Sequence, residues 1–428
     1  MATTEWRAVK LDELGFVGRG KSRHRPRNAA FLYGGSYPFF QTGDIKAANF
    51  HLTEYTQTYS DEGLAQSKLW KPGTLCITIA ANIAESAILG IEACFPDSVV
   101  GFVADPEKAD VRFIKYYMEI LKLQMQSVSR GTTQDNLSLD KLLTFDFRVP
   151  PLPVQRRIAG ILSAYDELIE NCQRRIRILE KMARNLYREW FIHFRYPGNC
   201  REIGSGPSTR PVVRPSPSGR RARDERAQLV PKGWEVRKLC EVAEVNRAQI
   251  NARTAPKAIH YIDISSVSPG QIDFLTSYAF ADAPGRARRI VQHGDVLWSC
   301  VRPNRRSYAQ VMYPEPNTIA STGFAVLTAT KVPFTFLYFA TTTDDFVAFL
   351  ANNATGAAYP AVSGATFEKA DLLIPPTPLL KRFGAATIPM AEQIHELHRQ
   401  IQNLRRTRDT LLPRLLAGQL ELKTQRNN

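Results

Sequence analysis

The sequence has few cysteines, and none of them form a recognisable metal-binding pattern. The six cysteines are far apart, at Cys76, Cys94, Cys172, Cys200, Cys240 and Cys300. Since no two of them form a Cys-x-x-Cys pair, no structural zinc site is predicted, and the thiols are expected to be reduced. His395 and His398 lie in the segment HELH, which does not have the HExxH spacing of a zinc helix. We therefore predict no metal site in this chain.

A long uninterrupted apolar run is also lacking. The most apolar stretch, residues 75–95, contains Asn82, Glu85 and Glu92, which favours buried strands over a membrane span. The first ten residues, MATTEWRAVK, do not include the apolar segment of a signal peptide. We therefore expect a cytoplasmic protein that does not associate with a membrane.

Acidic residues are in the minority. The 428 residues include 56 Lys and Arg against 41 Asp and Glu, which gives a formal net charge of +15 and a pI of about 9.6. Such a basic excess points first to nucleic acid as a partner. Because 44% of the residues are hydrophobic, the chain is long enough to bury the cores of two or three domains.

One stretch fits the pattern of a phosphate-binding P-loop. Residues 15–22 read GFVGRGKS, which matches G-x-x-x-x-G-K-[ST]. A P-loop follows a buried strand and precedes a helix. Here charged residues interrupt WRAVKLDEL before the motif, and Pro26 disfavours a helix after it. A P-loop ATPase is therefore the least favoured of the possible functions.

Other catalytic motifs are missing as well. The sequence contains no [DNS]-P-P-[FY] tetrad of an amino-methyltransferase, no G-x-G-x-x-G and no G-x-S-x-G. Together with the basic charge, these absences favour a binding protein over an enzyme.

The chain repeats itself once. WRAVKLDEL at residues 6–14 resembles WEVRKLCEV at 234–242, KPGTLCITI at 71–79 resembles QHGDVLWSC at 292–300, and FDFRVPPLPVQRR at 145–157 resembles ADLLIPPTPLLKR at 370–382. The matches keep the same order and a nearly constant separation. Two copies are too few for a solenoid, so we predict a pseudo-twofold protein.

Each copy ends in a long helix that begins after a Pro-Pro-x-Pro segment. Apolar side chains recur at spacings of three and four in residues 154–191 and in the matching segment of the second copy. This spacing predicts a coiled coil. Arg408 interrupts the second stripe, and Pro413 is expected to bend or end that helix. The residues expected to pack between helices or against partners are Leu168, Ile176, Leu179, Leu186, Leu397, Ile401, Leu404 and Leu411.

These patterns predict an α+β fold with two globular mixed α/β domains separated by two long antiparallel helices. The globular domains are expected at residues 1–150 and 233–375, and the helical segments at 151–194 and 376–428. Residues 195–232 are rich in Pro, Gly, Ser and Arg, which indicates a flexible linker.

Several motifs resemble the specificity subunit of type I restriction–modification enzymes. They are PPLPVQRRIAGILSAYDELIEN, LYREWFIHFRYPG, LPRLLAGQLEL and the turn-rich segment RGKSRHRPRN…YGGSYPFFQTGDI. The resemblance covers essentially the whole chain. It implies that each globular domain is a target recognition domain for one half of a split double-stranded DNA sequence, and that the helices space the halves and dock partners.

The resemblance also implies which partners carry the chemistry. Two methyltransferase subunits would modify adenine with S-adenosylmethionine, and two restriction/translocase subunits would use ATP and Mg. This chain would itself hold no cofactor and catalyse no reaction. An orphan DNA-binding or scaffold protein of the same fold is the alternative.

Basic loops provide the candidate DNA contacts, because Arg and Lys bind phosphates and Arg also pairs with guanine. In the first domain the candidates are Arg19, Lys21, Arg23, Arg25 and Arg27, followed by Tyr33 and Gln41. In the second domain they are Arg286 and Arg288 in PGRARRI, and Arg302, Arg305 and Arg306 in VRPNRRSY. Two polar loops at matching places add Thr132, Gln134 and Tyr359. Since the basic loops differ between the copies, we predict two different half-sites held about 34 Å apart, one turn of duplex.

Overall fold

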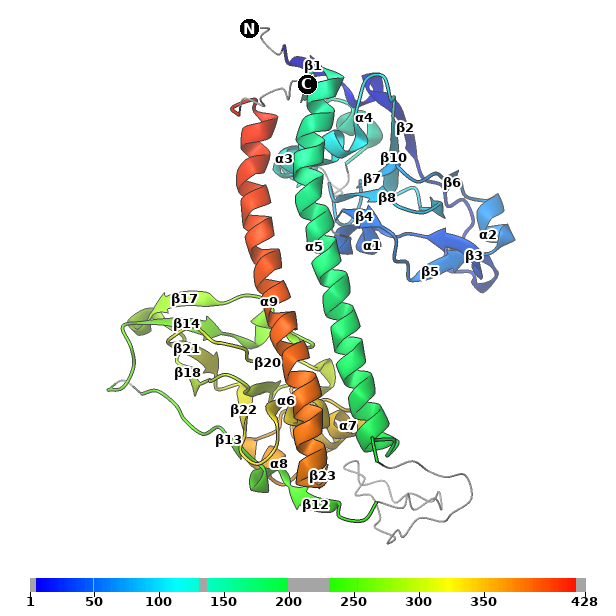
Figure 1. Ribbon diagram of the computed structural model, residues 1–428. Helices are drawn as coiled ribbons and strands as arrows, with labels where there is room; N and C mark the ends of the chain where they lie inside the picture. The colour runs from blue at the N-terminus through cyan, green and yellow to red at the C-terminus, as the bar shows by residue number, and fades with distance from the viewer. Residues whose placement is uncertain (1–4, 49, 131–136, 199–230, 252, 421–428) are drawn as a thin grey trace. The chain divides into compact units, whose positions relative to one another are not determined.

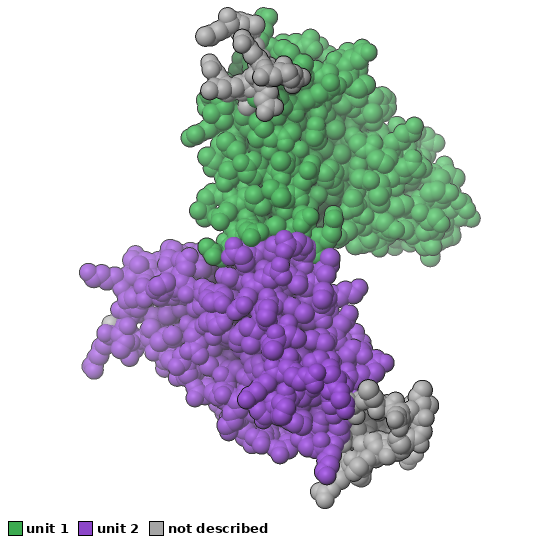
Figure 2. All heavy atoms as spheres, in the orientation of Figure 1, with its two compact units in different colours: residues 1–174, 398–428 green, residues 175–397 purple. Residues whose placement is uncertain are grey.

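The computed structural model describes residues 5–48, 50–130, 137–198, 231–251 and 253–420 (Figure 1). It divides into two compact units, which are coloured separately in Figure 2. Unit 1 comprises residues 1–174 and 398–428, and unit 2 comprises residues 175–397. Each unit therefore contains one globular part and a portion of both long helices. Most of the predicted linker, residues 195–232, lies outside the described residues.

Unit 1 is built on three sheets. In the first, β1 (Arg7–Val9) pairs with β11 (Phe147–Val149). The second has the order β2-β10-β7-β8-β4, with bounds Gly15–Arg19, Val99–Ala104, Leu75–Thr78, Ser86–Leu89 and His51–Leu52. The third has the order β5-β3-β9-β6, with bounds Gln57–Tyr59, Tyr33–Phe39, Ala93–Cys94 and Leu69–Trp70. The helices are α1 (Thr42–Ala47), α2 (Asp61–Ala65), α3 (Val111–Arg130) and α4 (Leu139–Leu142).

Unit 2 uses the same plan. Here β12 (Glu235–Lys238) pairs with β23 (Asp371–Ile374). One four-stranded sheet has the order β13-β22-β19-β20, with bounds Ala243–Val245, Phe324–Ala329, Val296–Ser299 and Tyr308–Gln310. The other has the order β17-β14-β21-β18, with bounds Thr276–Ala279, Ala258–Ile262, Thr318–Ser321 and Ala287–Ile290. A small hairpin joins β15 (Val267–Ser268) to β16 (Gln271–Ile272), and the helices are α6 (Phe334–Thr341), α7 (Asp344–Asn352) and α8 (Gly364–Glu368).

The strand pairings confirm the internal repeat. The order β2-β10-β7-β8 in unit 1 corresponds to β13-β22-β19-β20 in unit 2, and β5-β3-β9-β6 corresponds to β17-β14-β21-β18. In the latter pair of sheets the two central strands are parallel, β3 to β9 and β14 to β21, while both outer strands are antiparallel to their neighbours. The apolar residues 75–95 form β7, β8 and β9, as predicted, and every residue of these strands is buried. Among the described residues, no helix is long and apolar enough to cross a membrane.

The two predicted long helices are present, which confirms the α+β class. Helix α5 (Leu152–Tyr187) continues into a π-helical turn (Arg188–Ile192), and α9 spans Thr377–Leu416. Pro413 does not end α9, because its carbonyl still accepts a hydrogen bond from the Ala417 N–H at 2.9 Å. Proline removes only its own donor, and the helix ends one turn later.

Within each unit the portions of α5 and α9 run antiparallel. In unit 1, Asp166 contacts Arg408, and Cys172 Sγ lies 3.8 Å from Gln400 Oε1. In unit 2, the Tyr187 and Phe383 rings are 6.1 Å apart. In unit 1, the later position in α5 therefore meets the earlier position in α9.

The buried face of α5 differs at one position from the predicted stripe. Leu168 is 54% exposed, whereas Ile169 is 1% exposed. With Ile169 in place of Leu168, the step to Cys172 is three residues and the next step, to Ile176, is four. Of the other predicted positions, Ile176, Leu397 and Ile401 are buried, whereas Leu179, Leu186, Leu404 and Leu411 are partly buried.

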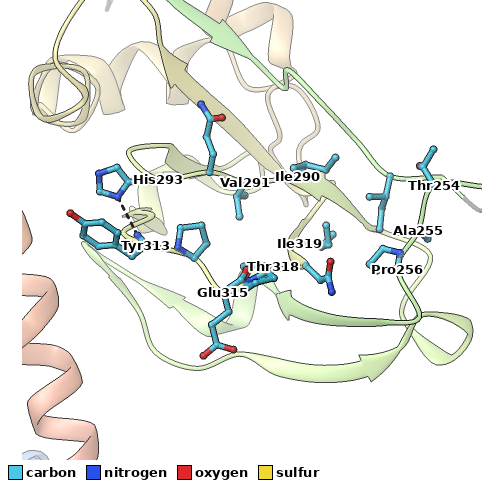
Figure 3. A pocket seen from close by; sticks show the side chains of 15 residues that line it. Thr254, Ala255, Pro256, Ile290, Val291, His293, Tyr313, Glu315, Thr318 and Ile319 are labelled. Carbon is cyan, nitrogen blue, oxygen red and sulfur yellow. Dashed lines mark hydrogen bonds between the residues drawn. The ribbon is translucent and has the colours of Figure 1, made fainter.

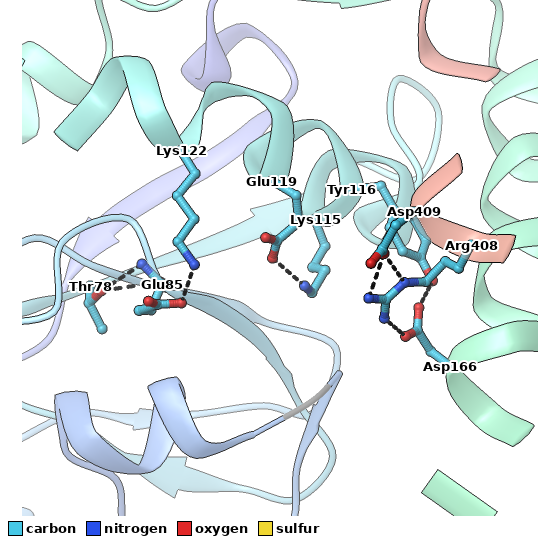
Figure 4. Close-up of polar contacts among 9 residues, drawn as sticks. All are labelled: Thr78, Glu85, Lys115, Tyr116, Glu119, Lys122, Asp166, Arg408 and Asp409. Carbon is cyan, nitrogen blue, oxygen red and sulfur yellow. Dashed lines mark hydrogen bonds and ion pairs between the residues drawn. The ribbon is translucent and has the colours of Figure 1, made fainter. Parts of the chain in front are cut away.

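A buried polar cluster joins three helices of unit 1. The carboxylate of Asp166 on α5 binds the guanidinium of Arg408 on α9 and accepts a hydrogen bond from the hydroxyl of Tyr116 on α3 (Figure 4). Arg408 also contacts Asp409 at 2.8 Å. The Asp166 side chain is only 2% exposed. The interruption of the second stripe at Arg408 is therefore explained by an acid at a buried position of α5.

Candidate DNA interface

The stretch that resembles a P-loop has a different structure. Gly15–Arg19 is itself the strand β2, and the chain after Lys21 is irregular rather than helical. Gly20 is required by close packing, because a Cβ at this position would lie 2.3 Å from the carbonyl oxygen of Phe95. The P-loop hypothesis is therefore excluded by the local fold.

An aspartate organises the basic loop of unit 1. Arg27 Nη2 lies 2.8 Å from both carboxylate oxygens of Asp97, and Arg19 Nε donates to the Asp97 carbonyl at 3.0 Å. Arg25 Nη1 donates to the carbonyls of Ser22 and His24 at 2.6 and 2.9 Å. These three arginines therefore brace the loop from inside.

Two cations of this loop are differently placed. Lys21 and Arg23 are exposed, and their side chains make no hydrogen bond or ion pair with any residue that the structure describes. Because no internal carboxylate competes for them, both are available to a phosphate or a base edge.

The remaining candidates of unit 1 fall into three groups. The Tyr33 ring packs 5.2 Å from Tyr59 and its hydroxyl donates to the Arg27 carbonyl at 2.8 Å, which is a supporting role. Gln41 is exposed, and its Nε2 donates to Gln57 Oε1 at 2.7 Å. Thr132 and Gln134 lie outside the described residues.

In unit 2, Arg286 is held by a carboxylate and a phenol. Its Nη2 lies 2.7 Å from Asp263 Oδ2, and its Nε donates to the Tyr261 hydroxyl at 3.1 Å. Burial acts to raise the pKa of Asp263, but hydrogen bonds from Ser265 and Tyr261 and the charge of Arg286 outweigh it, so this pKa lies below its usual range. The guanidinium of Arg288 lies 5.2 Å from the centre of the Phe280 ring.

The structure brings together two loops of unit 2 that are far apart in sequence. The guanidinium of Arg302 lies 4.9 Å from the centre of the Tyr359 ring, and the Arg302 N–H donates to the Pro360 carbonyl at 2.8 Å. Arg306 is bound to Asp344 at 2.5 Å. Arg305 is exposed, and within the described part of the chain its side chain has no polar partner. Arg305 in unit 2 is thus like Arg23 in unit 1: both side chains are exposed and have no polar partner among the described residues.

Sequence reasoning missed the acids that orient these arginines. Asp97 lies 70 residues from Arg27, and Asp263 lies 23 residues from Arg286. Neither acid stands out in the sequence, because each is an ordinary loop carboxylate until the fold places it beside its arginine. Lys68, whose Nζ lies over the Trp70 and Phe16 rings, was also absent from the predicted DNA contacts, because it lies outside the basic loops.

Unit 2 also contains an open pocket of about 730 Å³ (Figure 3). Its walls come from residues 250, 254–256, 290–293 and 313–319, and are mostly proline, aliphatic and aromatic side chains. The Tyr313 N–H donates to His293 Nδ1 at 3.2 Å, and the lining acid Glu315 lies 3.5 Å from His260. This lining offers no row of cations to DNA. Across the described residues, no group of three His, Cys, Asp or Glu side chains could hold a metal ion.

Comparison with known proteins agrees with this geometry. Residues 3–181 match the family model described as the type I restriction modification DNA specificity domain. The chain is 22% identical to the type I restriction enzyme MjaIX specificity subunit of Methanocaldococcus jannaschii, over 98% of this chain and 94% of the relative. The S subunit of a type I restriction-modification system from M. genitalium has the same fold, with a TM-score of 0.60 and 14% identity over 99% of this chain and 98% of that one. Residues 3–181 therefore carry the type I restriction modification DNA specificity domain, and over nearly its whole length the chain is similar to specificity subunits of type I restriction–modification systems.

Proposed function

We propose that this chain recognises an asymmetric, bipartite sequence in double-stranded DNA, with one half-site for each unit. The observation that carries this proposal is that two units of the same topology present different unpaired arginines. Arg23 follows β2 in unit 1, whereas Arg305 lies between β19 and β20 in unit 2. Arginine can bind guanine through two hydrogen bonds, so arginines at different places select different bases.

The long helices are the proposed docking sites for catalytic partners. Helix α5 exposes three large apolar side chains: Leu168 is 54% exposed, Ile178 51% and Met182 50%. Apolar side chains on an otherwise charged helix suit a protein partner. We infer two methyltransferase subunits and, in the restriction enzyme, two restriction/translocase subunits. S-adenosylmethionine, ATP and Mg would be bound by those subunits, and this chain would catalyse no step.

The test is to express the full chain with a type I modification subunit from the same genome, in a host without adenine methylation. N6-methyladenine is then mapped across the host DNA. The expected result is one new split motif with two different halves and a gap of fixed length that is not read. Expression of the modification subunit alone provides the control.

Two other results would contradict the proposal. A motif with identical halves would rule out the asymmetric target. No new methylation, with both proteins soluble and co-purifying, would favour an orphan DNA-binding or scaffold protein of this fold.

A further inference from the structure

The strand registers place Lys68 and Arg289 at equivalent positions of the two units. In unit 1, Leu69 of β6 pairs with Cys94, which also pairs with Phe39 of β3. In unit 2, Ile290 of β18 pairs with Ile319, which also pairs with Tyr261 of β14. Phe39 and Cys94 share a cluster with Tyr59 of β5, and Tyr261 and Ile319 share one with Tyr278 of β17, so Leu69 corresponds to Ile290. The residue before each of them is a cation: Lys68 immediately precedes the edge strand β6, and Arg289 lies in the edge strand β18.

Both cations are partly buried without a polar partner. Lys68 Nζ lies 3.6 Å from the centre of the Trp70 ring and 4.7 Å from that of Phe16. Arg289 Nε is buried and makes no hydrogen bond. Neither side chain forms an ion pair with any residue in the described ranges. A charge withdrawn from water is normally paired, so the missing counter-charge indicates an external anion.

The loop after β2 or β13 lies against the same edge in each unit. In unit 1, Ser67 Oγ donates to the Lys21 carbonyl at 2.8 Å, which brings Lys21 next to Lys68. Burial, and then the charge of Lys21, lower the pKa of Lys68. In unit 2, Gln249 forms a β-bridge with Arg289, and the Ile250 N–H donates to the Arg288 carbonyl at 2.8 Å. A phosphate at this edge would offset the repulsion between neighbouring cations.

We infer that Lys68 and Arg289 are equivalent phosphate-binding residues, one for the DNA backbone of each half-site. This inference rests on the proposed function. It adds that each unit binds the DNA backbone at the equivalent position of its fold, while the two units contact bases with different loops. Phosphate contacts fix the position of a protein on the duplex without selecting sequence. If the phosphate contacts are equivalent, the loops that contact bases can differ between the units while each unit keeps the same position on the duplex.

The cations in or beside these edge strands have a second explanation. Lysine and arginine on an edge strand also prevent pairing with another chain. That role requires charge but no contact with DNA, so the salt dependence of DNA binding separates the two explanations.

The experiment uses the full chain in complex with its modification subunit and a labelled duplex that carries the mapped motif. The variants are Lys68→Met, Arg289→Met and the double variant, because methionine keeps an unbranched stem and removes the charge. Lys141→Ala and Lys331→Ala, which remove a partly exposed lysine elsewhere in unit 1 and an exposed lysine elsewhere in unit 2, are the controls. The slope of log Kobs against log salt concentration is measured for each.

Each methionine variant is expected to reduce the magnitude of the slope by about 0.9, and the double variant by about 1.8, as for one and two lost phosphate contacts. The affinities for the motif and for a scrambled duplex should fall by the same factor. Lys68→Arg should keep the wild-type slope. Unchanged slopes in complexes that still bind the motif would overturn the inference and leave the proposed function intact. Failure of the wild-type complex to bind the motif would instead reject the proposed function, and this inference with it.

Discussion

At the residue scale, the arginines of the candidate interface divide into those that are held and those that are free to bind. Arg27, Arg286 and Arg306 are each held by a carboxylate: Asp97, Asp263 and Asp344, respectively. Exposed ion pairs add only about 0–1 kcal/mol to stability, so their main effect is to fix where the loop lies. Arg23 and Arg305 have no such partner among the described residues, and we propose them as the contacts to DNA bases.

A buried carboxylate gives a prediction about pH at this scale. Burial raises the pKa of Asp295 to about 6, although hydrogen bonds from Thr328 and the Gln292 N–H oppose the rise. Because the folded-state pKa lies above that of the unfolded chain, the free energy of unfolding should fall as pH rises from about 4 to about 6, and level off above. A shift of about two units corresponds to at most about 3 kcal/mol.

Asp295→Asn should remove that pH dependence. The amide oxygen can accept from Gln292, and the amide nitrogen can donate to the Thr328 hydroxyl. The variant should therefore be about 1–3 kcal/mol more stable than wild type at pH 8 and no more stable at pH 4. Urea unfolding followed by tryptophan fluorescence between pH 4 and 8 measures this, and the exposed Asp282→Asn provides the control. A parallel pH profile for Asp295→Asn and wild type would contradict the prediction.

At the element scale, the contact between α5 and α9 in unit 1 depends on a buried ion pair rather than on apolar residues alone. Arg408→Met should cost about 3–5 kcal/mol, because it leaves the buried carboxylate of Asp166 without its counter-charge. Adding Asp166→Asn should recover much of this loss, since the amide still accepts the hydrogen bond from Tyr116.

Thermal unfolding of the single and double variants measures that recovery. Asp409→Asn tests the exposed partner of Arg408 and should change stability by less than about 1 kcal/mol. If the double variant were as unstable as Arg408→Met, the loss would come from the shape of the arginine and not from the unpaired charge.

The same helices show which parts of the fold the sequence could predict. Spacings of three and four predicted both long helices, because a helix buries one face over many turns and single exceptions do not hide the period. The placement of Leu168 was wrong by one residue, because an acid, Asp166, occupies the buried face and an apolar stripe cannot include it. The order of the strands could not be predicted from the sequence, because β9 and β21 are too short to show an alternation of apolar and polar residues.

The candidate site was predictable in composition but not in geometry. Basic loops indicated nucleic acid as the class of ligand, and residues 3–181 match a DNA specificity domain. The ion pairs that separate bracing arginines from free ones join residues up to 70 positions apart, which no local pattern records. The equivalence of Lys68 and Arg289 likewise depends on strand pairing, because the surrounding sequences, QSKLW and ARRIV, share no identical residue that would show it.

At the scale of the whole molecule, two units with one topology predict two recognition events that can be disabled separately. Arg23→Ala should weaken binding to DNA with an intact first half-site by about 5- to 150-fold, which corresponds to about 1–3 kcal/mol for a lost bidentate contact. It should have little further effect on a duplex whose first half is already altered. Arg305→Ala should show the same behaviour for the second half.

Competition binding with three duplexes tests this: the mapped motif, and versions altered in the first or the second half. The losses for the double variant should add, because the two residues lie in different units and share no partner. Arg25→Ala is an informative comparison, since Arg25 binds loop carbonyls and its loss should loosen recognition of several bases. If Arg23→Ala weakened binding to all three duplexes equally, Arg23 would be a phosphate contact. Base selection in unit 1 would then belong to other residues.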